Sequence, residues 1–151
     1  MTHLKEGDTA PDFNCINEKG EKLSLSDYKG KKLILFFYPK DMTPGCTAEA
    51  CNLKDNYPDL IDKGYDLLGV SADDDKKHVR FIEKYDLPYS LLADTQKEVI
   101  NTYGVWGPKK FMGKEYDGIH RTTFVIDEKG KIERIFKKVK TKDHTNQIFS
   151  E

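Results

Sequence analysis

Cysteine is scarce in this sequence, which has three cysteines in 151 residues. Small secreted domains that depend on disulfides for stability carry many cysteines, usually in even numbers. The low, odd count therefore excludes a disulfide scaffold and indicates a reducing compartment. The first residues also lack the apolar stretch of a secretory signal. Together these absences predict a cytoplasmic protein.

Long apolar runs and an excess of one charge are also missing. No run approaches the roughly 18 apolar residues of a membrane-spanning helix. Lys and Arg number 25 against 26 Asp and Glu, a formal net charge of −1, whereas proteins that coat nucleic acid carry a strong basic excess. We therefore expect neither a membrane nor a nucleic-acid partner. Nothing marks a linker or a repeat, so the sequence predicts one domain over residues 1–151.

What the sequence does contain is an alternation of strand and helix patterns. Short, continuous apolar runs are typical of strands buried on both faces, and they occur at residues 33–38, 67–70 and 89–92. Apolar residues at three- and four-residue spacing predict helices, and they occur over residues 46–63, 75–85 and 95–103. Pro58 is expected to kink or restart the first helix, and Asp73 or Asp74 to cap the second.

The remaining segments predict how the sheet is completed. Residues 119–127 and 131–139 have the pattern of a closing β-hairpin, residues 104–118 look like a long loop, and Asp143 is placed to begin a short final helix. Residues 12–16 and 21–25 predict an extra N-terminal β-hairpin. This order predicts an α/β protein of thioredoxin-like fold, with a central mixed β-sheet flanked by helices.

Residues 39–51 contain the candidate reactive residues. They follow a central parallel strand at its carboxyl end, where α/β sheets place ligand sites. Cys46 falls in the first turn of the next helix, where free N–H groups and the positive end of the dipole favour an anion, here a nucleophilic thiolate. Cys46 alone equally fits a turn entering a helix. The spacing Pro39-x-x-x-Thr43-x-x-Cys46 favours the functional interpretation.

That spacing resembles the peroxidatic signature of the peroxiredoxins. The segment Thr43-Pro-Gly-Cys-Thr47, with Cys51 five residues after Cys46, is similar to the bacterioferritin comigratory protein (Q-type) subfamily. The resemblance covers nearly the whole chain, because three further segments also match in the right order: Gly7-Asp-Thr-Ala-Pro-Asp-Phe13, Leu33-Ile-Leu-Phe-Phe-Tyr-Pro39 and Gly118-Ile-His-Arg-Thr-Thr-Phe-Val-Ile-Asp127.

The resemblance implies a thiol peroxidase that reduces hydrogen peroxide and alkyl hydroperoxides. Cys46 attacks one peroxide oxygen and becomes a sulfenic acid. Thr43 and the backbone N–H of Cys46 hold the peroxide oxygens. Arg121 matches the essential arginine of the family, so it is expected to stabilise the thiolate and polarise the O–O bond. Taken alone, Arg121 fits an ordinary arginine on an edge strand better, and it is the match of the surrounding segment to the family that favours the catalytic role.

Further expectations come from the same resemblance. Pro39, Gly45 and Glu49 belong to the substrate pocket, and Glu49 orients an arginine, although acidic residues are favoured in a first helical turn anyway. A thioredoxin-type protein recycles the enzyme, which is a monomer or a weak homodimer. No phosphate loop or dinucleotide fingerprint is present, so we expect no cofactor. We also expect no metal, because the four histidines are scattered singly.

Cys51 is the resolving cysteine in the subfamily that the chain resembles. Five residues of α-helix separate two Cα atoms by about 8–9 Å, whereas a disulfide needs less than about 7 Å. If Cys51 resolves the sulfenic acid, the first turns of the helix must unwind in each cycle. The alternative is that Cys51 is a packed core thiol and that the enzyme uses Cys46 alone.

Other interpretations remain open. Cys15 is interpreted as a buried structural thiol beside Phe13. A thioredoxin-like disulfide reductase is the nearest rival, but it needs Cys-x-x-Cys. A redox sensor that uses the same thiol would be oxidised stoichiometrically, without turnover. His120 and Arg121 are neighbours, so one of them is expected to point inward. The segment 104–118 is either a second wall of the site, a cover for the core or an association surface.

Overall fold

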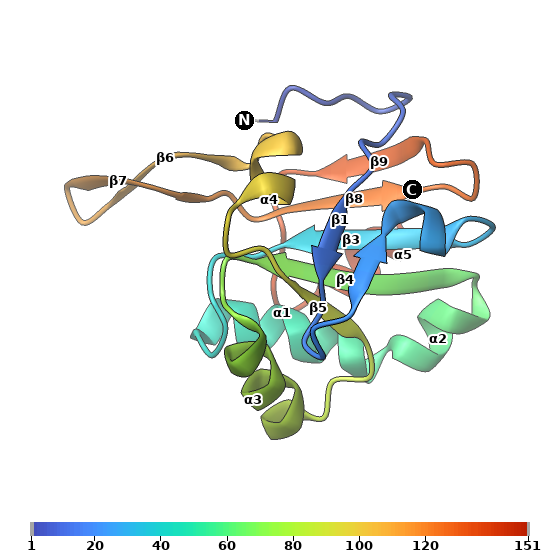
Figure 1. Cartoon of the computed structure of the whole chain (residues 1–151), viewed down its shortest axis with the longest axis horizontal. Helices are drawn as coiled ribbons and strands as arrows, with labels where there is room; N and C mark the ends of the chain where they lie inside the picture. Colours follow the sequence, from blue (N-terminus) through green and yellow to red (C-terminus); the bar gives the residue numbers. More distant parts are fainter. Residues whose placement is uncertain (1, 151) are drawn as a thin grey trace.

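The computed structural model describes residues 2–150, and it alternates strands with helices in the expected order (Figure 1). The strands are β1 (Asn14–Ile16), β2 (Lys22–Ser24), β3 (Lys32–Phe37), β4 (Tyr65–Ser71), β5 (Ser90–Ala93), β6 (Trp106–Phe111), β7 (Lys114–Ile119), β8 (Thr122–Ile126) and β9 (Ile132–Phe136). The helices are η1 (Leu25–Tyr28, a 3-10 turn), α1 (Pro44–Asp55), α2 (Tyr57–Asp62), α3 (Asp75–Tyr85), α4 (Glu98–Thr102) and α5 (His144–Phe149).

A five-stranded mixed sheet forms the centre, in the order β5-β4-β3-β8-β9. Strands β3, β4 and β5 run parallel, and β8 lies antiparallel to both β3 and β9. The predicted mixed sheet is therefore confirmed, as is the separate N-terminal hairpin of β1 and β2. Because β3 and β4 are parallel, their carboxyl ends reach the same edge of the sheet, and the loop before α1 leaves from that edge.

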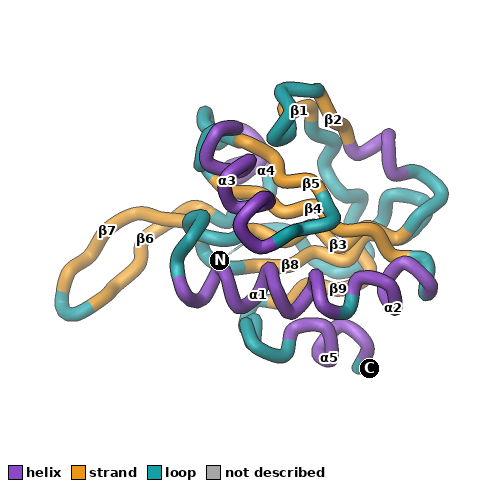
Figure 2. Tube along the Cα trace, turned by 90° about the horizontal axis from the view of Figure 1, so that it is seen from below, coloured by secondary structure: helices purple, strands orange, loops and turns teal. Residues whose placement is uncertain are grey.

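Alternation along β3 divides the core between the two faces of the sheet. Ile34, Phe36 and Tyr38 pack on the face that includes Cys46 and residues of α1, α2, α3 and α5. Leu33, Leu35 and Phe37 pack on the other face, with α4 and the N-terminal segment. All six are at most 1% exposed, as expected for a strand buried on both faces. Figure 2 shows α1 and α5 side by side below the sheet.

The long helical segment is interrupted close to the place that Pro58 predicts. Helix α1 ends at Asp55, Asn56 leaves the helical conformation with φ −108° and ψ 11°, and α2 restarts at Tyr57. Proline fits the first turn of the second helix, because its missing N–H is not needed there. The predicted restart is confirmed, and so is the Asp74 cap of α3, whose carboxylate accepts from the Lys77 N–H.

The expectation of a long loop over 104–118 is wrong. Strands β6 and β7 form a two-stranded hairpin that projects from the body of the molecule (Figure 1). Its two turn residues, Met112 and Gly113, both have positive φ angles, 52° and 77°, which is typical of a tight hairpin turn. Both strands are largely exposed on both sides, so no apolar alternation indicates them in the sequence. Phe111 and Met112, at the tip, are 66% and 87% exposed, so they do not cover the core.

The strand expected over 119–127 is also divided. Strand β7 ends at Ile119 and β8 begins at Thr122, so His120 and Arg121 lie in the break between the hairpin and the central sheet. The strand expected over 131–139 is shorter and ends at Phe136. Among residues 2–150, no helix has the length and apolar character needed to cross a membrane.

Gly69 makes the packing of the sheet testable. A Cβ atom there would lie 2.6 Å from Leu91 Cδ2 and 2.8 Å from Phe36 Cζ, so we expect Gly69→Ala to destabilise the protein by about 1–3 kcal/mol. Urea unfolding should show a smaller cost of the same substitution in a Leu91→Ala background, because one clash is removed. An equal cost in both backgrounds would contradict this packing.

Candidate active site

Cys46 lies at the third position of α1, whose N-terminal residues follow the loop that leaves β3. Thr43 is the residue before the helix, and Pro44 and Gly45 begin it. Proline suits this position because the first N–H groups of a helix have no partner within the helix. Cys46 is 2% exposed, and its thiol is free. The first turn of α1 therefore presents a buried sulfur where the helix dipole favours negative charge.

Arg121 is the cation that faces this sulfur. Its Nη2 lies 3.3 Å from Cys46 Sγ, and its Nη1 donates to Glu49 Oε1 at 2.6 Å. A Cβ atom at Gly45 would lie 3.3 Å from Nη2, so the glycine gives the guanidinium room beside the helix. Burial opposes the charge of Arg121, but Glu49 and Cys46 outweigh it and raise the pKa of Arg121. The arginine is a fixed, fully charged partner for the sulfur.

Glu49 supports Arg121 from one turn further along α1. It is fully buried, and Oε2, at 3.9 Å from His144 Nε2, is the buried side-chain oxygen without a hydrogen-bond partner among the described residues. Burial raises the pKa of Glu49 to about 7, although the charge and hydrogen bond of Arg121 lower it. The carboxyl group is therefore balanced between its two protonation states near neutral pH.

His144 closes the site from α5 in its neutral form. Burial, the largest effect, lowers the pKa of His144 to about 4. Its Nδ1 lies 2.9 Å from Gln147 Oε1, and its Nε2 lies 2.8 Å from Thr123 Oγ1. Since the amide oxygen is an acceptor only, Nδ1 carries the proton and Nε2 accepts from the threonine hydroxyl. An uncharged ring here leaves Arg121 as the cation that pairs with Glu49.

The other residues expected around the pocket lie at the same end of the sheet. Pro39 is half-buried directly beyond β3, and Thr43 is half-buried at the start of α1. The Thr43 hydroxyl donates to Lys40 O at 2.9 Å. That bond orients the oxygen and leaves its lone pairs free to accept. The structure thus brings Cys46, Arg121 and Glu49 into contact, with Thr43 three residues away on the same turn.

Cys51 and Cys15 lie in different surroundings. Cys51 is half-buried within the intact part of α1, and burial, only partly offset by Lys54, raises the pKa of its thiol. Cys15, in β1 of the N-terminal hairpin, packs against the core but is half-buried rather than buried as expected, and burial, with Asp94, raises the pKa of its thiol to about 12. Both thiols are protonated at neutral pH, so neither is an activated nucleophile in this conformation.

Sequence reasoning missed several polar residues at this end of the molecule. His78 is fully buried on the apolar side of α3, in line with Phe81, and helical spacing could have found it. Lys109 of β6 donates to Ile119 O at 2.9 Å, and burial and the nearby Arg121 lower the pKa of Lys109. His120 does not face the sulfur, because its Nε2 donates to Pro108 O at 2.9 Å.

Comparisons with known proteins identify the family of this chain. The AhpC/TSA family matches residues 6–135. Peroxiredoxin Bcp of Escherichia coli (strain K12) is 47% identical over 150 residues, which cover 99% of this chain and 96% of that protein. Peroxiredoxin Bcp of Bacillus subtilis (strain 168) is 47% identical over 141 residues, which cover 93% of this chain and 90% of that protein.

Solved structures give the same result. A cysteine-to-serine mutant of PrxQ from Xylella fastidiosa matches with a TM-score of 0.91 and 28% identity, over 98% of this chain and 94% of that one. Peroxidoxin BcpB from Mycobacterium tuberculosis matches with a TM-score of 0.85 and 34% identity, over 96% and 94%. Fold and comparisons therefore define a thiol-dependent peroxidase of thioredoxin-like fold. The chain belongs to the AhpC/TSA family and is a peroxiredoxin.

The buried carboxyl group predicts a pH-dependent stability. The pKa of Glu49 is raised from 4.5 to about 7 on folding. The folded state therefore binds the Glu49 proton more tightly than the unfolded state does. The resulting stabilisation of the fold is complete below about pH 4.5 and is lost as the pH rises through about 7. We expect the free energy of unfolding of the wild type, relative to Glu49→Gln, to fall across this range in urea titrations of the reduced protein. Glu133→Gln, at a surface ion pair with Lys32, is the control. A difference independent of pH would contradict the expectation.

Proposed function

We propose that Cys46 is the peroxidatic cysteine. The observation that carries the proposal is the 3.3 Å contact between Arg121 Nη2 and the buried Cys46 Sγ at the start of α1. The thiolate attacks one peroxide oxygen, an S–O bond forms and the O–O bond breaks. The leaving hydroxide or alkoxide takes a proton and departs as water or alcohol, and Cys46 is left as a sulfenic acid.

Arg121 and Thr43 stabilise that step in this proposal. Negative charge moves from sulfur to the leaving oxygen, so a guanidinium that contacts the sulfur is also placed to follow the charge. Glu49 holds the guanidinium in place through its 2.6 Å bond to Nη1. The hydroxyl of Thr43 and the N–H of Cys46 bind the peroxide oxygens, and Pro39 and Gly45 shape the approach.

Hydrogen peroxide and alkyl hydroperoxides are the proposed substrates. Both share the O–O bond that the thiolate attacks, and two prolines, half-buried Pro39 and exposed Pro44, precede Cys46 in the chain and offer apolar atoms to an alkyl group. A solved relative from Xanthomonas campestris is described by its alkyl peroxide reduction activity. It matches this chain with a TM-score of 0.86 and 29% identity, which supports extending the substrate class to alkyl hydroperoxides here.

Cys51 completes the cycle in this proposal. Its sulfur attacks the sulfenic sulfur of Cys46, a disulfide forms and water leaves. Both cysteines belong to the continuous helix Pro44–Asp55, and five residues of helix hold their Cα atoms about 8–9 Å apart, beyond the reach of a disulfide. The first turns of α1 must therefore unwind before the bond forms. A dithiol protein of the thioredoxin type then reduces the disulfide by two electrons.

Arg121→Lys tests the proposed role of the guanidinium. Lysine keeps the charge, but it lacks the planar guanidinium that can donate to the sulfur and to Glu49 at the same time. We expect the second-order rate constant for oxidation of Cys46 by hydrogen peroxide to fall about 10²–10³-fold, the usual loss when one oriented donor is removed. Stopped-flow kinetics measures it, with Arg80→Lys, an exposed arginine of α3, as the control. A wild-type rate in Arg121→Lys would rule the role out.

Cys51→Ser tests the resolving step. After one equivalent of peroxide, the wild type is expected to lose two hydrogens as a disulfide, whereas Cys51→Ser gains one oxygen as a sulfenic acid. Mass spectrometry distinguishes the two products. With a thioredoxin system, Cys51→Ser should lose sustained peroxide turnover, while Cys15→Ser keeps it. Unchanged turnover in Cys51→Ser would show that Cys46 works alone.

A further inference from the structure

The loop between β3 and α1 is fixed by a buried polar network. Asp41 is 5% exposed, and its two carboxylate oxygens accept from the Tyr38 hydroxyl at 2.5 Å and pair with His78 Nδ1 at 2.6 Å. Its backbone N–H donates to Asp73 Oδ2 at 2.8 Å, and the Ser71 hydroxyl donates to the same oxygen. One residue of the loop is therefore tied to β3, to the segment beyond β4, and to α3.

The contacts of His78 favour a charged ring. Its ring is fully buried, with Nδ1 against the Asp41 carboxylate and Nε2 at 2.8 Å from Leu92 O, at the end of β5. Both neighbours are acceptors, and a neutral imidazole has only one N–H to donate. The ring satisfies both contacts as imidazolium. Burial opposes this charge, but the hydrogen bond and charge of Asp41 outweigh it and raise the pKa of His78.

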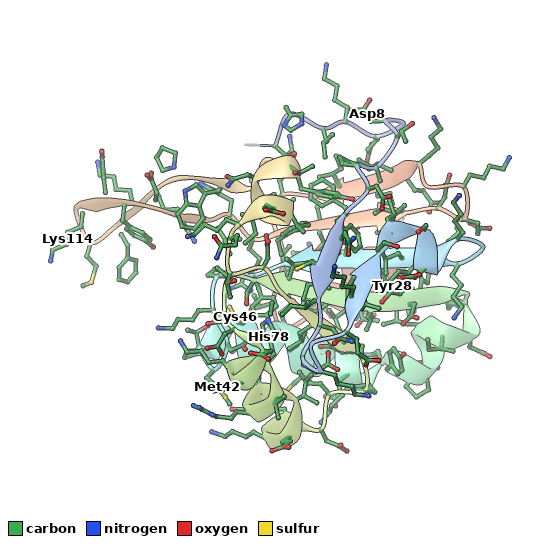
Figure 3. The ribbon with its side chains drawn as sticks, viewed as in Figure 1. Asp8, Tyr28, Met42, Cys46, His78 and Lys114 are labelled. Carbon is green, nitrogen blue, oxygen red and sulfur yellow. The ribbon has the colours of Figure 1, made fainter. Side chains whose placement is uncertain are left out.

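The segment after this ion pair leads directly to the proposed nucleophile. Met42 has a left-handed backbone, with φ 69°, which a residue other than glycine keeps only when its surroundings enforce it. Asp41 holds it on one side and the first turn of α1, beginning after Thr43, holds it on the other. Figure 3 labels Met42, Cys46 and His78, which come from the loop, α1 and α3 and lie at the same end of the ribbon.

We propose that Asp41 and His78 are positioning residues for the peroxide reaction, because their buried ion pair fixes the point from which α1 unwinds and refolds. This rests on the proposed cycle, in which the turns that carry Cys46 open and close. Residues 38–41 keep their contacts while the residues after Met42 rearrange. Thr43 and Cys46 therefore return to the same place relative to Arg121 after each reduction of the disulfide.

The proposal predicts a pH dependence that belongs to this ion pair. The charged groups that face His78 are Asp41 from the loop and Asp73 from the segment after β4. Lys77 Nζ of α3 lies 3.8 Å from Asp73 Oδ1, and Tyr38, directly after β3, contacts Asp41. Because the pKa of His78 is raised, the ion pair that holds the loop is complete when the pH is below the ordinary histidine pKa. It is lost as the pH rises through the raised pKa of His78. The rate of Cys46 oxidation should therefore have a descending limb on the alkaline side.

Asp41→Ala/His78→Leu is the central variant. Replacing both members of a buried ion pair with apolar residues is often neutral for stability. The double variant is therefore expected to fold but to lack the ion pair that holds the loop. Stopped-flow oxidation of Cys46 by hydrogen peroxide should be several-fold slower than in the wild type at neutral pH, without the alkaline limb. Because Glu49 titrates in both proteins, the difference between their pH–rate profiles gives the contribution of the ion pair alone. A folded double variant with the wild-type rate and profile would overturn the proposal.

Two further proteins sharpen the test. Asp41→Asn leaves the imidazole without its opposite charge, so at neutral pH it should react as slowly as the wild type does at alkaline pH. Tyr103→Phe also removes a buried hydrogen bond, to Pro11 O at 2.6 Å on the other face of the sheet, and should keep the wild-type profile. If Tyr103→Phe loses the alkaline limb as well, the effect is general destabilisation and the proposal fails.

A direct measurement separates this proposal from the proposed function. Nitrogen NMR of the wild-type ring reports whether His78 is imidazolium at neutral pH, independently of any peroxide chemistry. The imidazolium signal is expected in the wild type, and its loss in Asp41→Asn. A neutral ring in the wild type would refute the ion pair even if Cys46 reduces peroxide. Peroxide consumption that persists in Cys46→Ser would instead refute the proposed function, with the NMR result unaffected.

Discussion

The first turn of α1 is the element on which the rest of the site depends. While it is formed, Cys46 is buried at the positive end of a helix, with its sulfur 3.3 Å from Arg121. Glu49, one turn further along α1, lies within 2.6 Å of that arginine. It also keeps Cys51 out of reach, because five helical residues separate the two cysteines. In the proposed cycle, the same piece of helix therefore favours the attack on peroxide and, while it is formed, prevents the disulfide that follows.

In the described part of the chain, some side chains around that turn have all their hydrogen bonds, whereas one buried carboxyl group does not. Arg121 lies in a break between β7 and β8, so it extends from the edge of the sheet toward the helix rather than along a strand. Asp41, in the loop that precedes the helix, and His78 of α3 are fully hydrogen-bonded. Glu49, by contrast, is buried with one oxygen unpartnered among the described residues. The loop before the helix is therefore well bonded, whereas the helix carries an electrostatic cost one turn after Cys46, which suits the opening that the proposed cycle requires.

Some features of this structure can be predicted from the pattern of residues in the sequence, and others cannot. Strand β3, the restart of the helix near Pro58 and the position of Cys46 in a first helical turn were predictable, because burial and proline leave strong local signals. The β6–β7 hairpin was not, because its strands are exposed on both sides and lack apolar alternation. Nor was the pairing of Asp41 with His78, which are 37 residues apart. Partners that only the fold brings together leave no periodic trace in a single sequence.

Hydrogen exchange of the backbone amides reports whether the first turns of α1 unwind when the protein is oxidised. The reduced protein and the protein oxidised by one equivalent of peroxide would be compared by exchange and mass spectrometry, with the disulfide between Cys46 and Cys51 confirmed in the oxidised sample. We expect the amides of residues 47–51 to be protected in the reduced form, in which the Thr47 N–H donates to Thr43 O, and to exchange rapidly in the oxidised form, while β3 stays protected in both. Equal protection of residues 47–51 in a sample that contains this disulfide would contradict the proposed unwinding.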